Sequence, residues 1–267
     1  MTRLSSEDIK CPVCGEEVRI THLLSTNARG YSDLDLRPSE MQRSVMYQIT
    51  KMCTCGNVFM GTTSPATKEL VQSDAYQNCD GINFKNQKSI MFYRGYLIDK
   101  EHNPENIVSN FMQLNQCIWS CDDSDDENNI PLRKTAVKLV NQIIENEENE
   151  ESKTNYMLIK ADLLRRSGQF DELLQEYEDI HFEDPLLELI IDFQYKKSEE
   201  KDDKCYSIAS ALTPTAIALI DSILEDETDE ETKKGWIDIK EEILNGNERY
   251  LSNLMEQYFE NIKNNNN

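Results

Sequence analysis

Two close pairs of cysteines near the N-terminus constrain the fold of this chain more than any other feature of its sequence. Cys11 and Cys14 lie in a Cys-Pro-Val-Cys-Gly run, and Cys53 and Cys55 lie in a Cys-Thr-Cys-Gly run. A short turn of this kind directs two thiolates toward one point, and the glycine after it permits the tight backbone that follows. Two such turns predict a tetrahedral four-thiolate site for one Zn²⁺ ion. Because four sulfurs leave no coordination position open, the ion is expected to be structural.

Two alternatives to this zinc site remain open. The Cys-X-Cys spacing of the second turn is less common than Cys-X-X-Cys, so the cysteines could instead be reduced structural thiols or redox-active thiols. His22 is a possible substitute ligand, although the segment around it is predicted to be a strand, where a surface or packed histidine is more usual. Cys117 and Cys121 are four residues apart on a predicted helix and are expected to face the core as free thiols.

The charge of the chain limits the partners it can have. Its 267 residues include 28 Lys and Arg against 50 Asp and Glu, a net charge of -22, and all of this excess lies after residue 60. Such a surface repels phosphate backbones and anionic lipids, so nucleic acid is an improbable partner and a basic protein or peptide is a better one. Alternatively, the excess of Asp and Glu could serve only to keep the protein soluble. With no apolar run near ~18 residues and no signal-peptide pattern, we expect a cytoplasmic protein without a membrane-spanning helix.

The segment between the cysteine turns carries further motifs. Residues 25–38 read Ser-Thr-Asn-X-X-Gly-X-X-Asp-Leu-Asp-Leu-Arg-Pro, and residues 40–44 read Glu-Met-X-Arg-Ser. With these motifs the chain resembles a family of uncharacterised bacterial proteins that have a zinc-ribbon head and a helical, tetratricopeptide-like body. The resemblance covers about residues 9–212 and implies a fold and a metal, but no activity. The family's second turn usually reads Cys-Pro-X-Cys-Gly, which would place a ligand at Met52, so the ligand is displaced by one residue to Cys53.

Four charged residues of this segment form a possible recognition loop: Asp33, Asp35, Arg37 and Arg43. A long loop in a small metal domain is often where function resides. In the alternative interpretation, the two aspartates cap turns and pair with the arginines, so that the four residues hold the loop together.

Beyond about Pro65, apolar residues recur at three- and four-residue intervals, which predicts helices near 65–71, 90–98, 104–121 and 131–145. Residues 156–185 fit one tetratricopeptide unit, with the small Ala161 at the helix crossing, Gly168 ending the first helix and Pro185 closing the unit. Three further helices are expected to begin near Thr213, Glu230 and Asn247. Whether they fill the groove of the helical body is left open.

The expected fold is therefore mainly α. A small zinc-ribbon-like β head (1–62) is followed by a stack of tetratricopeptide-like helical hairpins (63–212), a C-terminal helical extension (213–263) and a disordered tail (264–267). We find no phosphate-binding glycine loop, no His-Glu-X-X-His and no Gly-X-Ser-X-Gly, and the three histidines lie in separate segments.

These features favour a non-enzymatic, zinc-stabilised interaction or scaffold protein, of unstated pathway and oligomeric state. One alternative is a nucleic-acid or transcription-associated zinc ribbon. It requires five basic residues to gather on one surface rather than pair with Asp33, Asp35 and Glu40; they are Arg19, Arg29, Arg37, Arg43 and Lys51. The other alternative is a zinc-thiolate redox switch, which requires an exposed, electropositive metal site.

Overall fold

The head consists of two β-hairpins and one helix. In the computed structural model, which describes residues 2–27, 29–60 and 65–265, strand β1 (Arg3–Lys10) pairs antiparallel with β2 (Glu17–Ser25), and Lys10 lies opposite Glu17 beside the first cysteine turn. Helix α1 (Glu40–Ile49) leads directly into a second hairpin, β3 (Thr50–Met52) and β4 (Val58–Met60), which encloses the second cysteine turn. The small β head predicted from the sequence is confirmed.

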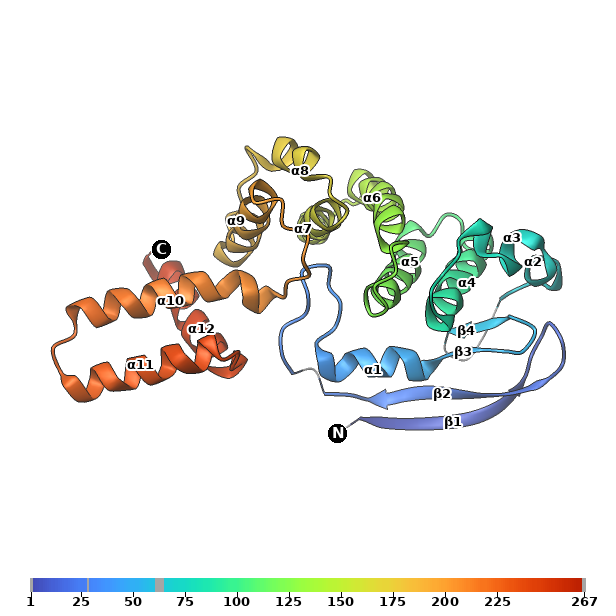
Figure 1. The fold of residues 1–267 in the computed structure, drawn as a ribbon, viewed down its shortest axis with the longest axis horizontal. Helices are drawn as coiled ribbons and strands as arrows, with labels where there is room; N and C mark the ends of the chain where they lie inside the picture. The colour runs from blue at the N-terminus through green and yellow to red at the C-terminus, as the bar shows by residue number, and fades with distance from the viewer. Residues whose placement is uncertain (1, 28, 61–64, 266–267) are drawn as a thin grey trace.

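The body is a row of helices that curves over the head (Figure 1). Its elements, in chain order, are α2 (Lys68–Gln72), α3 (Asp74–Gln77), the 3-10 turn η1 (Cys79–Gly81), α4 (Gln87–His102), α5 (Ile107–Asp122), α6 (Asn129–Asn146), α7 (Glu150–Arg166), α8 (Phe170–Tyr177) and α9 (Pro185–Glu199). From α4 to α9, helices adjacent in sequence are also neighbours in space, and short connections join them. The mainly α body is therefore as predicted.

The end of α7 follows the sequence prediction. Gly168 has φ +75°, the N–H of Gly168 donates to the carbonyl of Arg165, and the N–H of Gln169 donates to the carbonyl of Leu164. This is the Schellman arrangement that glycine favours after a helix. Ala161, in the middle of α7, is fully buried, as expected for a residue at a helix crossing.

The main core runs through the body without interruption. It joins apolar residues of α4 to α9 and includes Cys117 and Cys121, both fully buried and unoxidised. The Sγ of Cys117 lies 3.4 Å from the Ser89 carbonyl, and the Sγ of Cys121 lies 3.6 Å from the Ser89 hydroxyl. The two thiols thus occupy the core position predicted for them.

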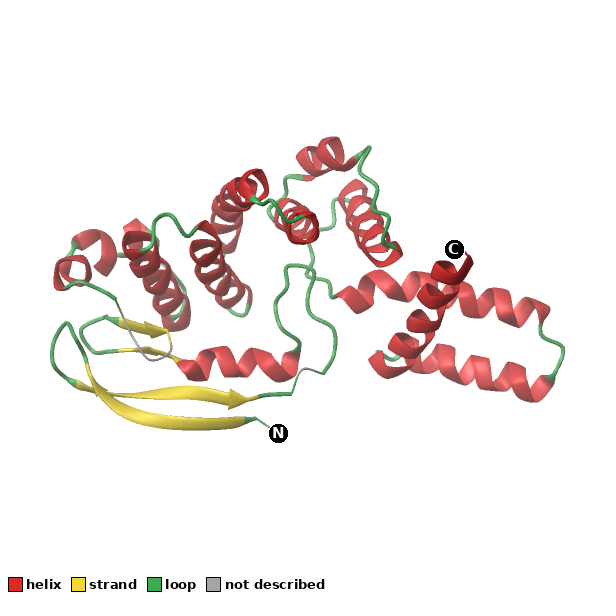
Figure 2. Ribbon diagram, turned by 180° about the vertical axis from the view of Figure 1, so that it is seen from behind, coloured by secondary structure: helices red, strands yellow, loops and turns green. Residues whose placement is uncertain are grey.

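A second, smaller core holds the C-terminal unit, which consists of α10 (Ile208–Asp226), α11 (Glu230–Leu244) and α12 (Glu248–Asn265). Its buried members are Leu212, Ala216, Ile220, Ile243, Leu251 and Met255. In Figure 2 these helices lie at the opposite end of the molecule from the turn that joins β1 to β2. They extend the row of helices and do not cover the side of the body that faces the head.

Three expectations about this region need correction. The helix expected at Thr213 begins five residues earlier, because Ser207 and Ser210 form a capping box, so the predicted boundary between residues 212 and 213 lies inside α10. Pro214 lies inside the helix. The hydroxyl of the preceding residue, Thr213, donates to the carbonyl of Ala209 at 2.8 Å. Residues 264 and 265, expected to be disordered, belong to α12, and residues 266–267 lie outside the described part. The predicted boundary between residues 62 and 63 lies outside it too.

Helix α10 is also longer and more apolar than the sequence analysis allowed. An 18-residue window of this 19-residue helix has a mean hydropathy of 1.4, enough by length and composition alone to cross a membrane, and 22% of that window is buried inside the fold. The core helix of a water-soluble unit passes the same test, and α10 does supply three of the six buried residues of the second core. Thr213, Pro214 and Asp221 interrupt its apolar residues, so its sequence contains no uninterrupted apolar run of that length.

Candidate metal centre and its attachment to the helical body

Each cysteine turn is closed by backbone hydrogen bonds. In the first, the N–H of Gly15 donates to the carbonyl of Cys11 at 2.8 Å, and Gly15 has φ +77°. In the second, the N–H of Gly56 donates to the carbonyl of Cys53 at 2.9 Å, and Gly56 has φ +93°. Both glycines occupy the left-handed region that L side chains avoid, as the Cys-Gly pairs in the sequence predicted.

The two turns bring the four predicted sulfurs together. The Sγ atoms of Cys11, Cys14, Cys53 and Cys55 all lie within 4.8 Å of one another, and none of the four forms a disulfide. The Cys11–Cys55 sulfur separation is 3.8 Å and the Cys14–Cys53 separation is 3.6 Å. A tetrahedron of sulfurs about 2.3 Å from a central ion has edges of about 3.8 Å. The cluster therefore fits a tetrahedral metal ion, and the shortened Cys-X-Cys turn does not prevent Cys53 from taking part.

The electrostatics of the thiols also favour a bound cation. Burial raises the pKa of Cys11, but the backbone N–H groups of Cys14 and Val13 outweigh it and lower the pKa of Cys11 to about 7. Burial, together with the neighbouring thiols, raises the pKa of Cys55 to about 12. Four thiolates at this spacing repel one another strongly, so all four can ionise together only around a positive ion.

Neither His22, the possible substitute ligand, nor Met52 enters the cluster. The ring Nε2 of His22 lies 2.9 Å from Glu7 Oε1 across the β1–β2 hairpin, so His22 is an ordinary surface histidine. The Sδ of Met52, at the position where the related family usually has its first ligand, accepts from Arg94 at 3.5 Å. The displacement of the ligand by one residue thus leaves Met52 in contact with α4.

The second cysteine turn is fastened to the body. The Tyr76 hydroxyl of α3 donates to the carbonyl of Gly56 at 2.8 Å, and Arg94 of α4 donates to the carbonyl of Gln77 at 2.8 Å. A Cβ atom on Gly56 would come within 2.9 Å of the Arg94 guanidinium. The metal centre and the start of the helical body therefore pack as one unit.

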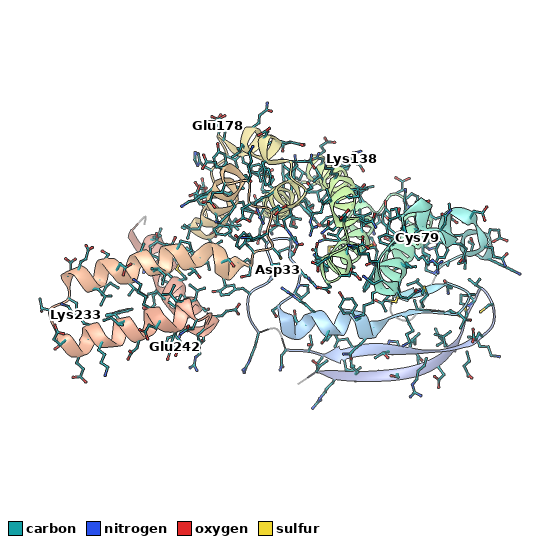
Figure 3. The ribbon with its side chains drawn as sticks, in the orientation of Figure 1. Asp33, Cys79, Lys138, Glu178, Lys233 and Glu242 are labelled. Carbon is teal, nitrogen blue, oxygen red and sulfur yellow. The ribbon has the colours of Figure 1, made fainter. Side chains whose placement is uncertain are left out.

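The four charged loop residues lie between the head and the body. Arg43 donates to Asp33 at 2.6 Å and to the Pro38 carbonyl at 2.8 Å, which is the local pairing that the alternative interpretation predicted. Figure 3 shows Asp33 where the loop, α7 and α10 meet. Burial and the nearby Asp35 raise the pKa of Asp33, although Arg43 opposes them.

Asp35 and Arg37 find their partners on distant helices. Asp35 is fully buried, and its Oδ2 accepts from Trp119 at 2.9 Å and from Arg166 at 3.0 Å. Arg37, also buried, donates to both carboxylate oxygens of Asp123 at 2.7 Å. The loop thus occupies the side of the helical row that faces the head, and three of its four charged side chains are less than a tenth exposed.

The partners on the body were not recognised from the sequence. The carboxylate of Asp122, at the end of α5, forms ion pairs with Arg133 of α6 (N···O 2.5 Å) and with Arg166 of α7 (N···O 2.8 Å). The carboxylate of Asp162 pairs with Arg165 at 2.6 Å. The sequence shows these partners only as two short charged runs, Trp119-Ser-Cys-Asp-Asp123 and, further along the chain, Arg165-Arg166. Nothing in the spacing of these runs indicates that they meet, because they are more than 40 residues apart.

The five basic residues that the nucleic-acid hypothesis requires on one surface are not gathered there. Arg37 and Arg43 are engaged by Asp123 and Asp33, while Arg19 lies opposite Asp8 in the hairpin register. Arg29 and Lys51 are exposed on separate elements, a loop and β3. Pairing of the two loop arginines counts against the nucleic-acid hypothesis.

Comparison with known proteins gives one match. A model of the family described as "Uncharacterized protein conserved in bacteria (DUF2225)" matches residues 4–192. The matched region takes in both cysteine turns and most of the helical body, and it ends within α9, before the C-terminal unit. No curated protein and no solved structure matches the chain.

Proposed function

The chain belongs to the DUF2225 family of bacterial proteins, as its motifs predicted, and we propose that it is a non-enzymatic scaffold whose head is stabilised by one structural Zn²⁺. The observation that carries this proposal is the closed set of four cysteine sulfurs, all within 4.8 Å. A donor set of four thiolates leaves no position for substrate or water, so the ion would serve the fold rather than a reaction. Cys11, Cys14, Cys53 and Cys55 would hold it.

Zinc is the proposed ion because of the donor chemistry. Soft thiolates in a tetrahedral arrangement suit zinc or iron, and not calcium or magnesium, which prefer oxygen ligands. Zinc has no redox chemistry of its own, which agrees with a purely structural role. Close cysteine pairs that serve a metal site are typical of a reducing compartment, so we place the protein in the cytoplasm.

An interaction role is supported by how the buried charges are used. Asp35, Asp122 and Asp162 are each matched by an arginine in the interior, so these groups hold the fold together and are not held ready for catalysis. The side of the body facing the head carries the chain's own loop. A protein partner would therefore bind an outer surface, where the excess acid favours a basic protein or peptide.

A redox switch is the second candidate, and one feature favours it. Cys14 is exposed, so an oxidant can reach the cluster from solvent, and the pKa of Cys11 is lowered to about 7, which increases its thiolate fraction. Loss of zinc during mild peroxide treatment, with recovery on reduction, would favour the switch. Retention of zinc under the same treatment would favour the structural role.

The test of the proposed function begins with metal content. The purified protein should contain about one zinc per chain, the Cys53→Ser/Cys55→Ser variant should contain none, and Cys205→Ser, which changes an exposed cysteine outside the cluster, should match the parent. A parent without zinc would contradict the proposal.

The interaction role needs a second experiment. The intact zinc-loaded chain, used as bait in a bacterial lysate, should retain a basic protein whose capture weakens as salt rises. The cluster variant should retain less of the same protein. If no protein binds the parent more strongly than the cluster variant, the scaffold role fails while the metal assignment stands.

A further inference from the structure

A groove opens between the head's loop and the C-terminal unit. Its volume is about 1210 Å³, and its walls come from the loop around Gly30, the N-terminal part of α1, the start of α10 and the start of α12. Gly30 has φ +91°, and a Cβ atom there would come within 2.7 Å of Glu248 Oε2, so the loop lies directly against the start of α12. The size exceeds the roughly 300–1,000 Å³ usual for small-molecule sites, so the groove can admit a nucleotide-sized ligand.

The charged residues that line the groove are mainly basic, whereas those of the whole chain are mainly acidic. Three arginines line it, Arg29, Arg43 and Arg249, against two carboxylates, Asp33 and Glu248. Asp33 is bonded to Arg43, and Glu248 accepts the N–H of Tyr31 at 3.1 Å. In a chain of net charge -22, this lining has an excess of positive charge.

Two of these arginines are available to a ligand. Arg29 and Arg249 are exposed, and no carboxylate within 4.0 Å pairs with either of them among the residues that the structure describes. They approach the groove from different elements, the loop and α12. Guanidinium groups bind phosphate through paired hydrogen bonds, which a lysine cannot reproduce.

Hydroxyl groups and helix ends add to the arginines. Ser207 and Ser210 lie along the groove and share one hydroxyl–hydroxyl hydrogen bond, so one of the two O–H groups can donate to an anion, whereas the hydroxyl of Ser252 already donates to Glu256 at 3.0 Å. Three helices also begin at it, after Ser39, Ser207 and Asn247, and the N-terminal end of a helix carries partial positive charge. Some of their N–H groups are already capped, for example Ser210 N–H by the Ser207 hydroxyl, so the helices contribute a favourable field more than direct contacts.

We propose that this groove binds a small anion carrying two or more phosphate groups, with Arg29 of the loop and Arg249 of α12 each contacting a phosphate. The separate origin of the two arginines favours a diphosphate or triphosphate over a single phosphate, because one phosphate cannot satisfy two guanidinium groups on different elements as well as two phosphates can. The site is independent of the zinc centre and of any protein partner.

Isothermal titration calorimetry on the intact, zinc-loaded chain tests this site. The probes are inorganic phosphate, pyrophosphate, ATP and, as an anion of different chemistry, sulfate, all at matched ionic strength. Pyrophosphate and ATP should bind at least about tenfold more tightly than phosphate or sulfate. Arg29→Gln and Arg249→Gln should each weaken pyrophosphate binding about tenfold, as expected for loss of one charge-assisted contact.

Arg19→Gln is the matched control, because Arg19 is exposed on β2, outside the groove, and its replacement changes the net charge equally. It should leave the affinity within about twofold of the parent. Thermal unfolding of the variants should match the parent, since all three arginines are exposed. Absence of heat with every probe up to about 10 mM overturns the proposal. Equal binding of sulfate and pyrophosphate, or equal weakening by Arg19→Gln, also overturns it, because either result shows adventitious ion binding only.

Discussion

The indole Nε1 of Trp119 donates a 2.9 Å hydrogen bond to the carboxylate of Asp35, 84 residues earlier in the chain. Asp35 is fully buried, and its other oxygen accepts the backbone N–H of Arg37 at 3.1 Å. Arg166 supplies the positive charge, 3.0 Å from the oxygen that Trp119 also contacts. This contact connects the head's loop to α5 and α7 together, so the loop is expected to unfold together with the helical body.

Replacement of Asp35 by asparagine should strongly destabilise the protein. The substitution preserves shape but removes the negative charge that Arg166 faces in the interior, and breaking a buried ion pair typically costs about 3–5 kcal/mol. Because Arg166 also contacts Asp122 at 2.8 Å, we expect the lower end of that range. Urea unfolding should show a lower midpoint with an unchanged m-value.

Glu178→Gln is the control for this substitution. Glu178 is exposed at the end of α8 and points away from the helical row in Figure 3, and the change removes the same unit of charge. It should alter stability by less than about 0.5 kcal/mol. Equal stability of the two variants would show that Asp35 does not hold the loop to the body.

The loss of stability at acidic pH should depend on Asp122. Burial alone would raise the pKa of this carboxyl, but the guanidinium groups of Arg133 and Arg166 outweigh burial and hold the pKa below its ordinary value of 3.8. A carboxyl whose pKa is lowered by folding stabilises the native state above its unfolded pKa, and that stability is lost as pH falls through the folded pKa. Asp122→Asn should therefore flatten the decline of unfolding free energy below about pH 4, measured by urea titration between about pH 2 and 7.

Asp33 should act in the opposite sense. Burial, with the nearby Asp35, raises its pKa above 3.8, so the folded state takes up a proton more readily than the unfolded state. Protonation of Asp33 favours folding as pH falls between the folded and unfolded pKa values, and Asp33→Asn should remove this contribution and make the acid decline steeper. If the two variants change the slope in the same direction, the assignment of these pKa directions is wrong.

What the sequence could predict was local. The cysteine turns, the Gly168 helix end and the buried pair Cys117 and Cys121 are each specified within a few residues, and the structure places them as predicted. The start at Thr213 failed because a Thr-Pro pair is a strong local signal for a helix start, whereas the Ser207 cap that actually begins α10 carries a weaker one.

The loop shows why the rest could not be predicted. Asp33 and Arg43 are ten residues apart, and pairing within the loop was one of the two interpretations left open. The pairing of Asp35 with Arg166 spans 131 residues and depends on how α5 and α7 stack, which no local pattern specifies. Without knowledge of that stacking, a charged loop buried against the body and a charged loop exposed for recognition have the same sequence.

Removal of the metal should loosen the head while the body keeps its helices. Among the residues that the structure describes, the small core around the cluster has five buried apolar members, Cys11, Val18, Ile20, Cys53 and Phe59, so it is too small to hold the two turns together alone. After chelation, hydrogen exchange of the amides in β3 and β4 should quicken by at least about tenfold, and that of α6 and α7 should change little. Uniform exchange across the chain after chelation would contradict this separation.

Two glycines of this chain should respond in opposite directions to the same substitution. Gly168 has φ +75° and Gly235 lies in the interior of α11 at a helical φ, yet an added Cβ would meet no atom within 4 Å at either position. A new steric contact therefore contributes at neither position, and the backbone conformation alone decides how alanine changes the free energy of unfolding.

Gly168→Ala should destabilise the protein by about 1 kcal/mol, because an L side chain in the left-handed region is strained. Gly235→Ala should stabilise it by about 0.5–1 kcal/mol, because alanine has the higher helix propensity and restricts the unfolded chain. Urea midpoints of the two variants, measured beside the parent, should fall on opposite sides of it. If Gly168→Ala matched or exceeded the parent, α7 would not end in the Schellman turn that aims the chain into α8, and the hairpin between these helices would need a different explanation.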